Sequence, residues 1–269
     1  MRRQGWWHAF LNILFPEKDV CLFCLQKDKS AEHMRLCHEC TEKILKITEE
    51  LETCPFCGFF TAGDACPTCR SWREKFLRVG TVVPYEGMFR ELIHDLKFNG
   101  RKDWARPLGY LMACRVRRLG FAEKIQAIIP VPLYSGREKE RGFNQSLLLA
   151  EVIAAELQKP LWSEALAREH FHHPQMMLSR EERMQNIAGA FRYAQGREMR
   201  GGMILLVDDI ITTGATLLAC ADILRQVGAR DVWAITWAVG YNVKLMEKVA
   251  GSWFYYEKAK EKSINKKYQ

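Results

Sequence analysis

The stretch ILLVDDIITTGAT, residues 204–216, places four aliphatic residues ahead of two adjacent aspartates and a run of small and hydroxyl residues. The apolar run predicts a buried strand over 204–207, with Asp208 and Asp209 at its carboxyl edge. The residues that follow predict a loop that opens a helix at about Leu217, and a helix start favours a bound anion. This loop consists of Thr212, Thr213, Gly214, Ala215 and Thr216. The stretch can therefore hold a phosphate in the loop while the two carboxylates accept hydrogen bonds from a diol, which together describe a ribose 5-phosphate.

Two other interpretations of the aspartates were weighed. They could simply cap the strand and the helix, with no ligand. A strand that ends in two acids also fits the Walker B motif of nucleoside triphosphatases. However, the chain contains no GxxxxGK[ST] sequence, so the Walker B interpretation lacks its phosphate loop.

The flanking sequence alternates apolar strand patterns with helical ones. Strands without internal polar alternation, each followed by a helix, predict an α/β domain with an open, mainly parallel sheet covered on both faces. In such sheets ligands bind beyond the carboxyl ends of the strands. The expected strands cover 79–87, 127–133, 201–209 and 231–240, and the expected helices cover 88–100, 105–120, 142–157 and 216–229.

Length and composition favour a soluble cytoplasmic protein. The chain has 269 residues, enough for one large domain and a small module. No apolar run approaches the roughly 18 residues of a membrane span. Residues 1–17 have no small-residue cleavage site, so an amphipathic helix is preferred there to a signal peptide. The net charge of +8 is compatible with an anionic partner, and part of it lies in a basic tail, residues 251–269.

Eight of the ten cysteines form four CxxC pairs inside a predicted module, residues 18–72. Two CxxC turns can complete a tetrahedral zinc site, so the module could hold two structural zinc ions. The pairs could couple in order or alternate, and disulfides or a redox CxxC are the competing interpretations. Cys114 and Cys220, outside the module, are expected to be structural helix residues. The eight candidate ligands are Cys21, Cys24, Cys37, Cys40, Cys54, Cys57, Cys66 and Cys69.

The stretch LLVDDIITTGAT resembles the phosphoribosyl-pyrophosphate signature of type I phosphoribosyltransferases. Further segments resemble the ComF family of competence-associated proteins. They are the CxxC pairs, YEGMFRELIHDLKFNGR, IIPVPLYSGREKERGFNQS and QMMLSREERMQNIAGAF. The resemblance covers residues 21–239 and implies a type I phosphoribosyltransferase-like domain over 73–250.

The resemblance also implies roles for individual residues. The family's enzymes bind phosphoribosyl pyrophosphate with magnesium, and the two aspartates would contact its ribose hydroxyls. Arg137 and Arg141 would hold the pyrophosphate against the loop after IIPVPL, and Lys97 would add positive charge at a helix end. Arg168 would begin a flexible loop that closes over the substrate, together with Gln175, Arg180, Arg183 and Asn186. In that loop His170 and His172 depart from the family pattern.

Two functions follow from these observations. The first is a zinc-bearing phosphoribosyltransferase with an unidentified acceptor that acts in DNA uptake during natural competence. The second is a non-catalytic protein that binds single-stranded DNA or partners a competence helicase. The expected location is the cytoplasm, with recruitment to the DNA-uptake machinery at the inner face of the membrane as a further possibility.

Overall fold

The computed structural model describes residues 19–50, 54, 56, 58, 77–168, 190–194, 199 and 201–240. The chain divides into two compact units, Met1–Lys43 with Met246–Gln269 and Ile44–Leu245. The predicted N-terminal helix and basic tail lie outside the described residues. No helix in the described ranges is long and apolar enough to cross a lipid bilayer.

The larger unit is built on a four-stranded parallel sheet of order β1-β6-β5-β2. Its strands are β1 (Leu77–Pro84), β2 (Ile125–Pro130), β5 (Met203–Ile211) and β6 (Asp231–Val239). The central strands are almost continuously buried, since both faces of the sheet are covered. The prediction of a mainly parallel α/β sheet is therefore confirmed.

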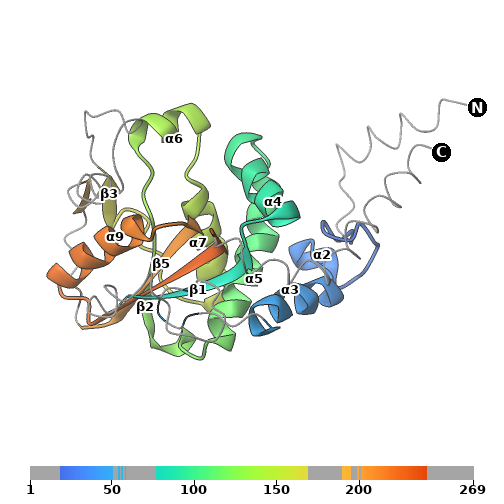
Figure 1. The fold of residues 1–269 in the computed structure, drawn as a ribbon, viewed down its shortest axis with the longest axis horizontal. Coiled ribbons are helices and arrows are strands. Elements are labelled where there is room, and N and C mark those ends of the chain that lie inside the picture. The colour runs from blue at the N-terminus through green and yellow to red at the C-terminus, as the bar shows by residue number, and fades with distance from the viewer. Residues whose placement is uncertain are drawn as a thin grey trace, which may run out of the picture. The chain divides into compact units, whose positions relative to one another are not determined.

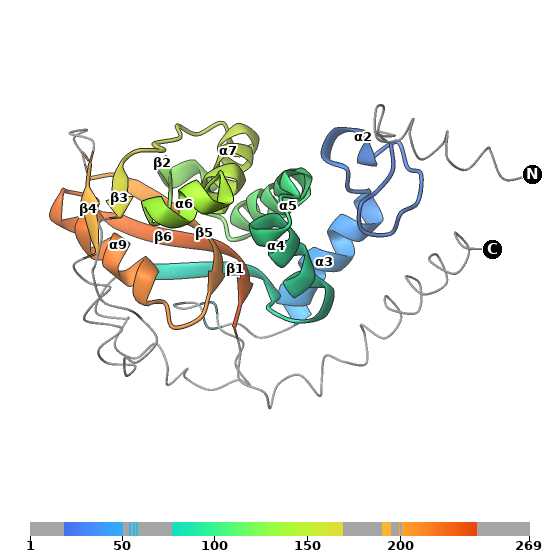
Figure 2. The ribbon, with the colours of Figure 1, turned by 90° about the horizontal axis from the view of Figure 1, so that it is seen from above.

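Helices cover the two faces of this sheet (Figures 1 and 2). On one face lie α5 (Ala105–Arg118) and α7 (Gln145–Leu157), and on the other lies α9 (Ala215–Gln226). The helices α5 and α7 pack closely because Gly109 has no side chain, and a Cβ there would lie 2.7 Å from that of Val152. Buried leucines of α9 pack against Ile204, Leu206 and Val232.

Helix α4 (Gly87–Phe98) follows β1 and is fixed to the last part of β6. The indole Nε1 of Trp237 donates to the carbonyl of Phe89 at 3.2 Å, and their rings meet edge to face at 5.9 Å. The short 3₁₀ segments η2 (Lys102–Trp104) and η3 (Ala122–Lys124) precede α5 and β2. As predicted, the α4 helix closes at Asn99 and Gly100, the glycine with a φ of 65°.

Strand β5 extends further along the chain than the sequence predicted, to Ile211 instead of Asp209. The aspartates lie within it, because β5 stays paired with β6 up to Ile211. Its pairing with β2 ends earlier, at Val207, so from Asp208 onward that edge of the strand is open. The loop after β5 is shorter than expected. Gly214, with a φ of 73°, ends the turn, and α9 starts at Ala215 instead of Leu217.

Two further features differ from the expected pattern. The segment after β2 was expected as a loop, but it contains a short helix, α6 (Ser135–Arg141), which stops at Gly142 with a φ of 77°. Glutamate, lysine and arginine, which fill α6, are good helix formers. A second, antiparallel pair of strands, β3 (Leu166–Arg168) and β4 (Phe191–Tyr193), was not predicted, because three residues are too few to show a periodic pattern.

The outer edge of β1 contacts Phe56 and Gly58. The amide of Val79 donates to the carbonyl of Phe56 at 3.1 Å, and the hydroxyl of Thr81 donates to the carbonyl of Gly58 at 3.1 Å. These contacts cover part of an edge that would otherwise present unpaired backbone groups.

In the smaller unit the described residues form two CxxC turns and helix α2 (Ala31–Met34). Helix α3 (His38–Glu50) begins there and contains the division between the units. The carbonyl of Cys21 accepts from the amide of Leu25 at 2.9 Å, which closes the first turn, and Leu25 has a φ of 59°.

Candidate functional site

Asp208 and Asp209 point to opposite sides of β5, as neighbouring residues of a strand do. The carboxylate of Asp208 interacts with Arg168 and lies near the thiol of Cys220 on α9. Asp209 faces the other side, where it forms an ion pair with Lys97 and interacts electrostatically with Arg141. Positively charged side chains therefore interact with the two aspartates on both sides of the strand.

Asp208 is held by two donors on one oxygen. Its Oδ1 accepts from the hydroxyl of Ser146 at 2.9 Å and from the amide of Asp209 at 2.9 Å. Burial, together with the negative charge of Asp209, raises the pKa of Asp208 to about 7. Its second oxygen is thus the place where a proton or a ligand hydroxyl can be accommodated.

Asp209 forms an ion pair with Lys97 from the end of α4. The lysine Nζ lies 2.6 Å from Oδ2 of Asp209, and both side chains are largely buried. The pair is screened little by water, so it fixes the end of α4 against β5. A hydroxyl that binds Asp209 would compete with Lys97 and free its ammonium for a neighbouring anion.

The turn after β5 leads directly into α9. Thr212 and Thr213 are exposed, while Gly214 and Ala215 are buried. The amide of Ala215 donates to Oγ1 of Thr213 at 3.4 Å, and the amide of Leu218 donates to the carbonyl of Gly214 at 2.9 Å. The intervening first-turn amides have no partner within the helix, so this turn can bind a phosphate.

Arg141 and Arg137 lie on α6. Arg141 donates from Nη1 to Oε1 of Gln145 at 2.6 Å, and its guanidinium lies over the ring of Phe98, 4.8 Å from the centroid. Burial lowers the pKa of Arg141, and the charge of Asp209 opposes that shift. Arg137 is exposed, and its positive charge contributes to lowering the pKa of both Arg141 and Arg168.

Arg168 ends β3 and lies over the ring of Phe191 at 5.2 Å. Burial and the charge of Arg137 lower its pKa, while Asp208 opposes that shift. The structure thus brings Arg168 to the Asp208 side of the strand. The other residues expected in the closing loop, with His170 and His172, lie outside the described residues.

Two residues of this cluster were missed by sequence reasoning. Ser146 holds Asp208, although the two are 62 positions apart. It is the second residue of α7, whose start is fixed by Asn144, and no residue pattern shows which strand a helix start will meet. Phe98 follows the predicted Lys97, and its exposure could be seen only in the structure.

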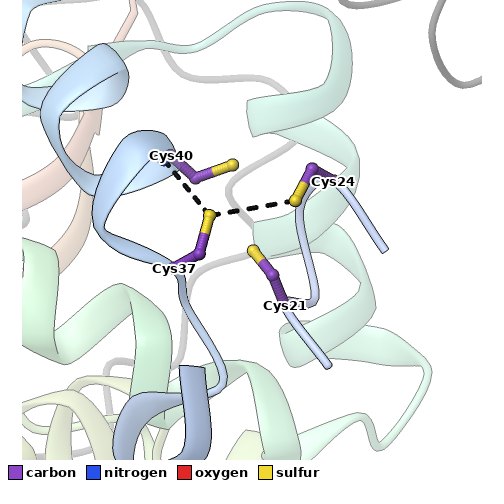
Figure 3. Close-up of side chains that lie close together, drawn as sticks. All are labelled: Cys21, Cys24, Cys37 and Cys40. Atoms are coloured by element: carbon purple, nitrogen blue, oxygen red, sulfur yellow. Dashed lines mark hydrogen bonds between the residues drawn. The ribbon is translucent and has the colours of Figure 1, made fainter. Parts of the chain in front are cut away.

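The first four cysteines converge in the smaller unit (Figure 3). Their sulfurs all lie within 4.8 Å of one another, and those of Cys24 and Cys37 are 3.8 Å apart. A tetrahedral ion with bonds of about 2.3 Å to sulfur needs separations of about 3.8 Å. These four residues are therefore positioned to bind one metal ion, and the first two CxxC pairs couple in order.

The other cysteines have different surroundings. Cys54 is buried beside β1, while Cys57, Cys66 and Cys69 lie outside the described residues. All seven cysteines in the described ranges are free of disulfide bonds. Cys220 is buried in α9, where burial raises its pKa, and Cys114 is half-buried in α5, so their predicted structural role fits.

Comparisons with known proteins agree with this geometry. Residues 144–263 match the model of the phosphoribosyl transferase domain. The "DNA utilization protein YhgH" of Shigella flexneri is 34% identical over 80% of this chain and 96% of its own length. The "Competence protein ComFC" of Bacillus subtilis is 30% identical over 77% of this chain and 82% of its own. The "Competence protein F" of Haemophilus influenzae is 29% identical, over 70% of this chain and 86% of its own.

The fold is thus that of a phosphoribosyltransferase, with a cysteine cluster toward the N-terminus that can bind a metal ion. The similarity to the first of these relatives covers 80% of this chain, a larger share than the domain match alone. The chain belongs to the ComF family.

Proposed function

We propose that the chain binds magnesium-bound phosphoribosyl pyrophosphate at the carboxyl end of β5 and transfers its phosphoribosyl group to an acceptor in DNA utilization. The observation that carries this proposal is the continuous unit of β5, turn and α9. It places two carboxylates directly before a hydroxyl-bearing turn with free helix amides. The carboxylates suit the diol of a ribose, and the turn suits a phosphate a few ångströms from that diol.

Each residue in the cluster has a role in the proposal. Asp208 and Asp209 accept hydrogen bonds from the ribose hydroxyls, and the turn over 212–216 holds the 5-phosphate. Arg137, Arg141 and Lys97 bind the pyrophosphate, for which guanidinium forks and an ammonium are suited. In the transfer, the bond from the anomeric carbon to the pyrophosphate oxygen breaks and a bond to the acceptor forms. The charge of Asp208 acts on Arg168, whose guanidinium would stabilise the negative charge that develops on the leaving pyrophosphate.

Structural zinc is the second part of the proposal. Four cysteine sulfurs in a closed cluster, without a histidine or carboxylate ligand, suit a structural rather than a catalytic zinc ion. The ion would stabilise the smaller unit and take no part in the transfer. The expected location is the cytoplasm, where such thiols stay reduced.

The test of the transfer is a screen for pyrophosphate release. Purified protein is incubated with magnesium, phosphoribosyl pyrophosphate and candidate acceptors, beginning with nucleobases and single-stranded DNA. We expect release that depends on one acceptor class and is lost in the Asp208→Asn/Asp209→Asn protein. Release no faster than the spontaneous hydrolysis of the donor with every acceptor would argue against turnover.

A second candidate function is direct binding of single-stranded DNA beside a competence helicase. The net charge of +8 and the names of the relatives favour it. Binding through phosphate contacts must weaken as salt increases. If the purified protein shows no salt-dependent affinity for a single-stranded oligonucleotide, this function is refuted.

A further inference from the structure

Phe98 is an apolar side chain that the fold leaves in contact with water. It is the last residue of α4, whose inward face is made by Phe89, Leu92, Ile93 and Leu96. Its side chain is 62% exposed, and the other exposed large apolar residue in the described ranges is Leu25, at 46%. A single exposed phenylalanine needs no explanation by itself. Its surroundings, however, are those of a binding site.

The ring of Phe98 lies in the cluster around Asp209. The preceding residue, Lys97, is ion-paired with Asp209 at 2.6 Å. The guanidinium of Arg141, which interacts electrostatically with Asp209, lies over the Phe98 ring with its Cζ 4.8 Å from the centroid. The imidazole of His94 lies 4.7 Å from the same ring and is tilted by 43°. Phe98 is therefore an exposed aromatic surface at the rim of the proposed donor site.

Cationic and aromatic side chains alternate around this position. Lys102 is exposed and lies over the ring of Phe143, 4.8 Å from its centroid. Phe143 follows Arg141 by two residues, just after the end of α6. The hydrogen bond from Arg141 to Gln145 holds its guanidinium plane in place. Such a surface favours a flat, electron-rich ring that carries or adjoins negative charge.

We propose that Phe98 is a stacking site for a nucleobase, next to the bound phosphoribosyl donor. This rests on the proposed function for the position of the donor, because the base would stack beside the ribose that Asp209 holds. The base can come from two sources, a free nucleobase or a base in single-stranded DNA. Both offer the same flat ring to Phe98.

The experiment uses 2-aminopurine, whose fluorescence is quenched when it stacks. The full-length protein is titrated against the free base and against an oligonucleotide with one 2-aminopurine, each with and without magnesium phosphoribosyl pyrophosphate. We expect Phe98→Ala to weaken binding of at least one probe by roughly 5- to 100-fold, the range for loss of one base stack. Phe98→Leu should lose as much, because it is apolar but not aromatic, and Phe98→Tyr should retain binding.

The outcomes separate the sources and the two proposals. A loss confined to the free base identifies a small acceptor, and a loss confined to the oligonucleotide identifies a base within a strand. Leu25→Ala, the other exposed apolar residue, is the matched control and should bind as wild type does. If neither probe binds, or Phe98→Ala binds both within twofold of wild type, the stacking site is wrong. The proposed donor site fails separately, if the wild-type protein does not bind phosphoribosyl pyrophosphate.

Discussion

Asp208 combines two properties that conflict. Desolvation and a neighbouring carboxylate raise the pKa of this half-buried residue to about 7, whereas its proposed role is to accept hydrogen bonds, which the ionised form does most strongly. Ser146 and the amide of Asp209 limit this conflict by donating to the same oxygen. A raised pKa of this kind is typical of binding sites, and it supports the proposed ligand role of Asp208 over that of a strand cap.

The pKa of Asp208 predicts a pH dependence of stability. An aspartate in the unfolded chain ionises near pH 4, so between about pH 4 and 7 the folded protein binds the extra proton. The free energy of unfolding therefore falls as pH rises through that window. Asp208→Asn, which keeps the acceptor oxygen, should raise the melting temperature at pH 8 by about 5 °C or more and leave it unchanged at pH 4.

The matched control for this measurement is Asp209→Asn. It removes the partner of buried Lys97, so it should lower the melting temperature throughout the same pH range. Thermal unfolding of the three proteins from pH 4 to 8 gives the comparison. An Asp208→Asn protein that melts no higher than wild type at pH 8 would contradict the raised pKa.

At the scale of single residues, the sequence predicted the identity of the aspartates and the turn but not their partners. Two adjacent acids after an apolar run are a local pattern, visible in any window of the chain. The contacts of Ser146 and Lys97 with these acids, and the electrostatic effect of Asp208 on Arg168, depend on how distant elements pack. The direction of the pKa shift depends on the same packing, so the residue types could not indicate it.

Helix α7 is the element that connects the β2 edge to the site. Its N-cap, Asn144, accepts from the amides of Ser146 and Leu147 at 2.9 and 3.4 Å. Its Nδ2 also donates to the buried carbonyl of Val131 at 3.1 Å, directly after β2. The cap thus fixes the position from which Ser146 reaches Asp208.

Loss of this cap should destabilise the protein. Asn144→Ala removes three hydrogen bonds and leaves the carbonyl of Val131 unpaired, so we expect a loss of about 2–3 kcal/mol in denaturant unfolding. The control is Gln158→Gly at the other end of α7, where a left-handed φ of 53° suits glycine. That variant should be as stable as wild type or slightly more so. Equal stability of both variants would show that the cap is not a structural anchor.

The elements themselves were largely predictable because their signals are local. The apolar runs of β2, β5 and β6 and the helix end at Asn99–Gly100 appear in the structure where the sequence placed them. The failures have physical causes. Polar α6 has no apolar periodicity, and the extension of β5 beyond Val207 depends on pairing with β6, which no single strand reveals.

For the whole molecule, the main prediction is the metal content. Protein prepared anaerobically should contain at least one equivalent of zinc, bound by Cys21, Cys24, Cys37 and Cys40. Cys37→Ser should reduce the zinc content by one equivalent, because three sulfurs no longer close a tetrahedral site. Cys114→Ala, outside the cluster, should leave it unchanged. Wild-type protein without zinc, or a Cys37→Ser protein with the full content, would refute the assignment.

The order of cysteine coupling illustrates what sequence could not decide. Four CxxC pairs allow consecutive or alternating sites, since spacing within each pair is the same. Only the fold shows that the first turn meets the second, at the start of α3. The domain limits at residues 17, 72 and 250, by contrast, stay predictions.

The most direct test of the account is calorimetric titration of the whole protein with phosphoribosyl pyrophosphate in the presence of magnesium. We predict saturable binding to one site, weakened at least about tenfold in Asp208→Asn/Asp209→Asn by loss of the hydroxyl contacts. Thr236→Val is the control, because Thr236 is paired with Asp208 in the register of β5 and β6 and its buried hydroxyl has no hydrogen bond within the described ranges. No binding by wild type, or equal binding by the doubly substituted protein, would contradict the account.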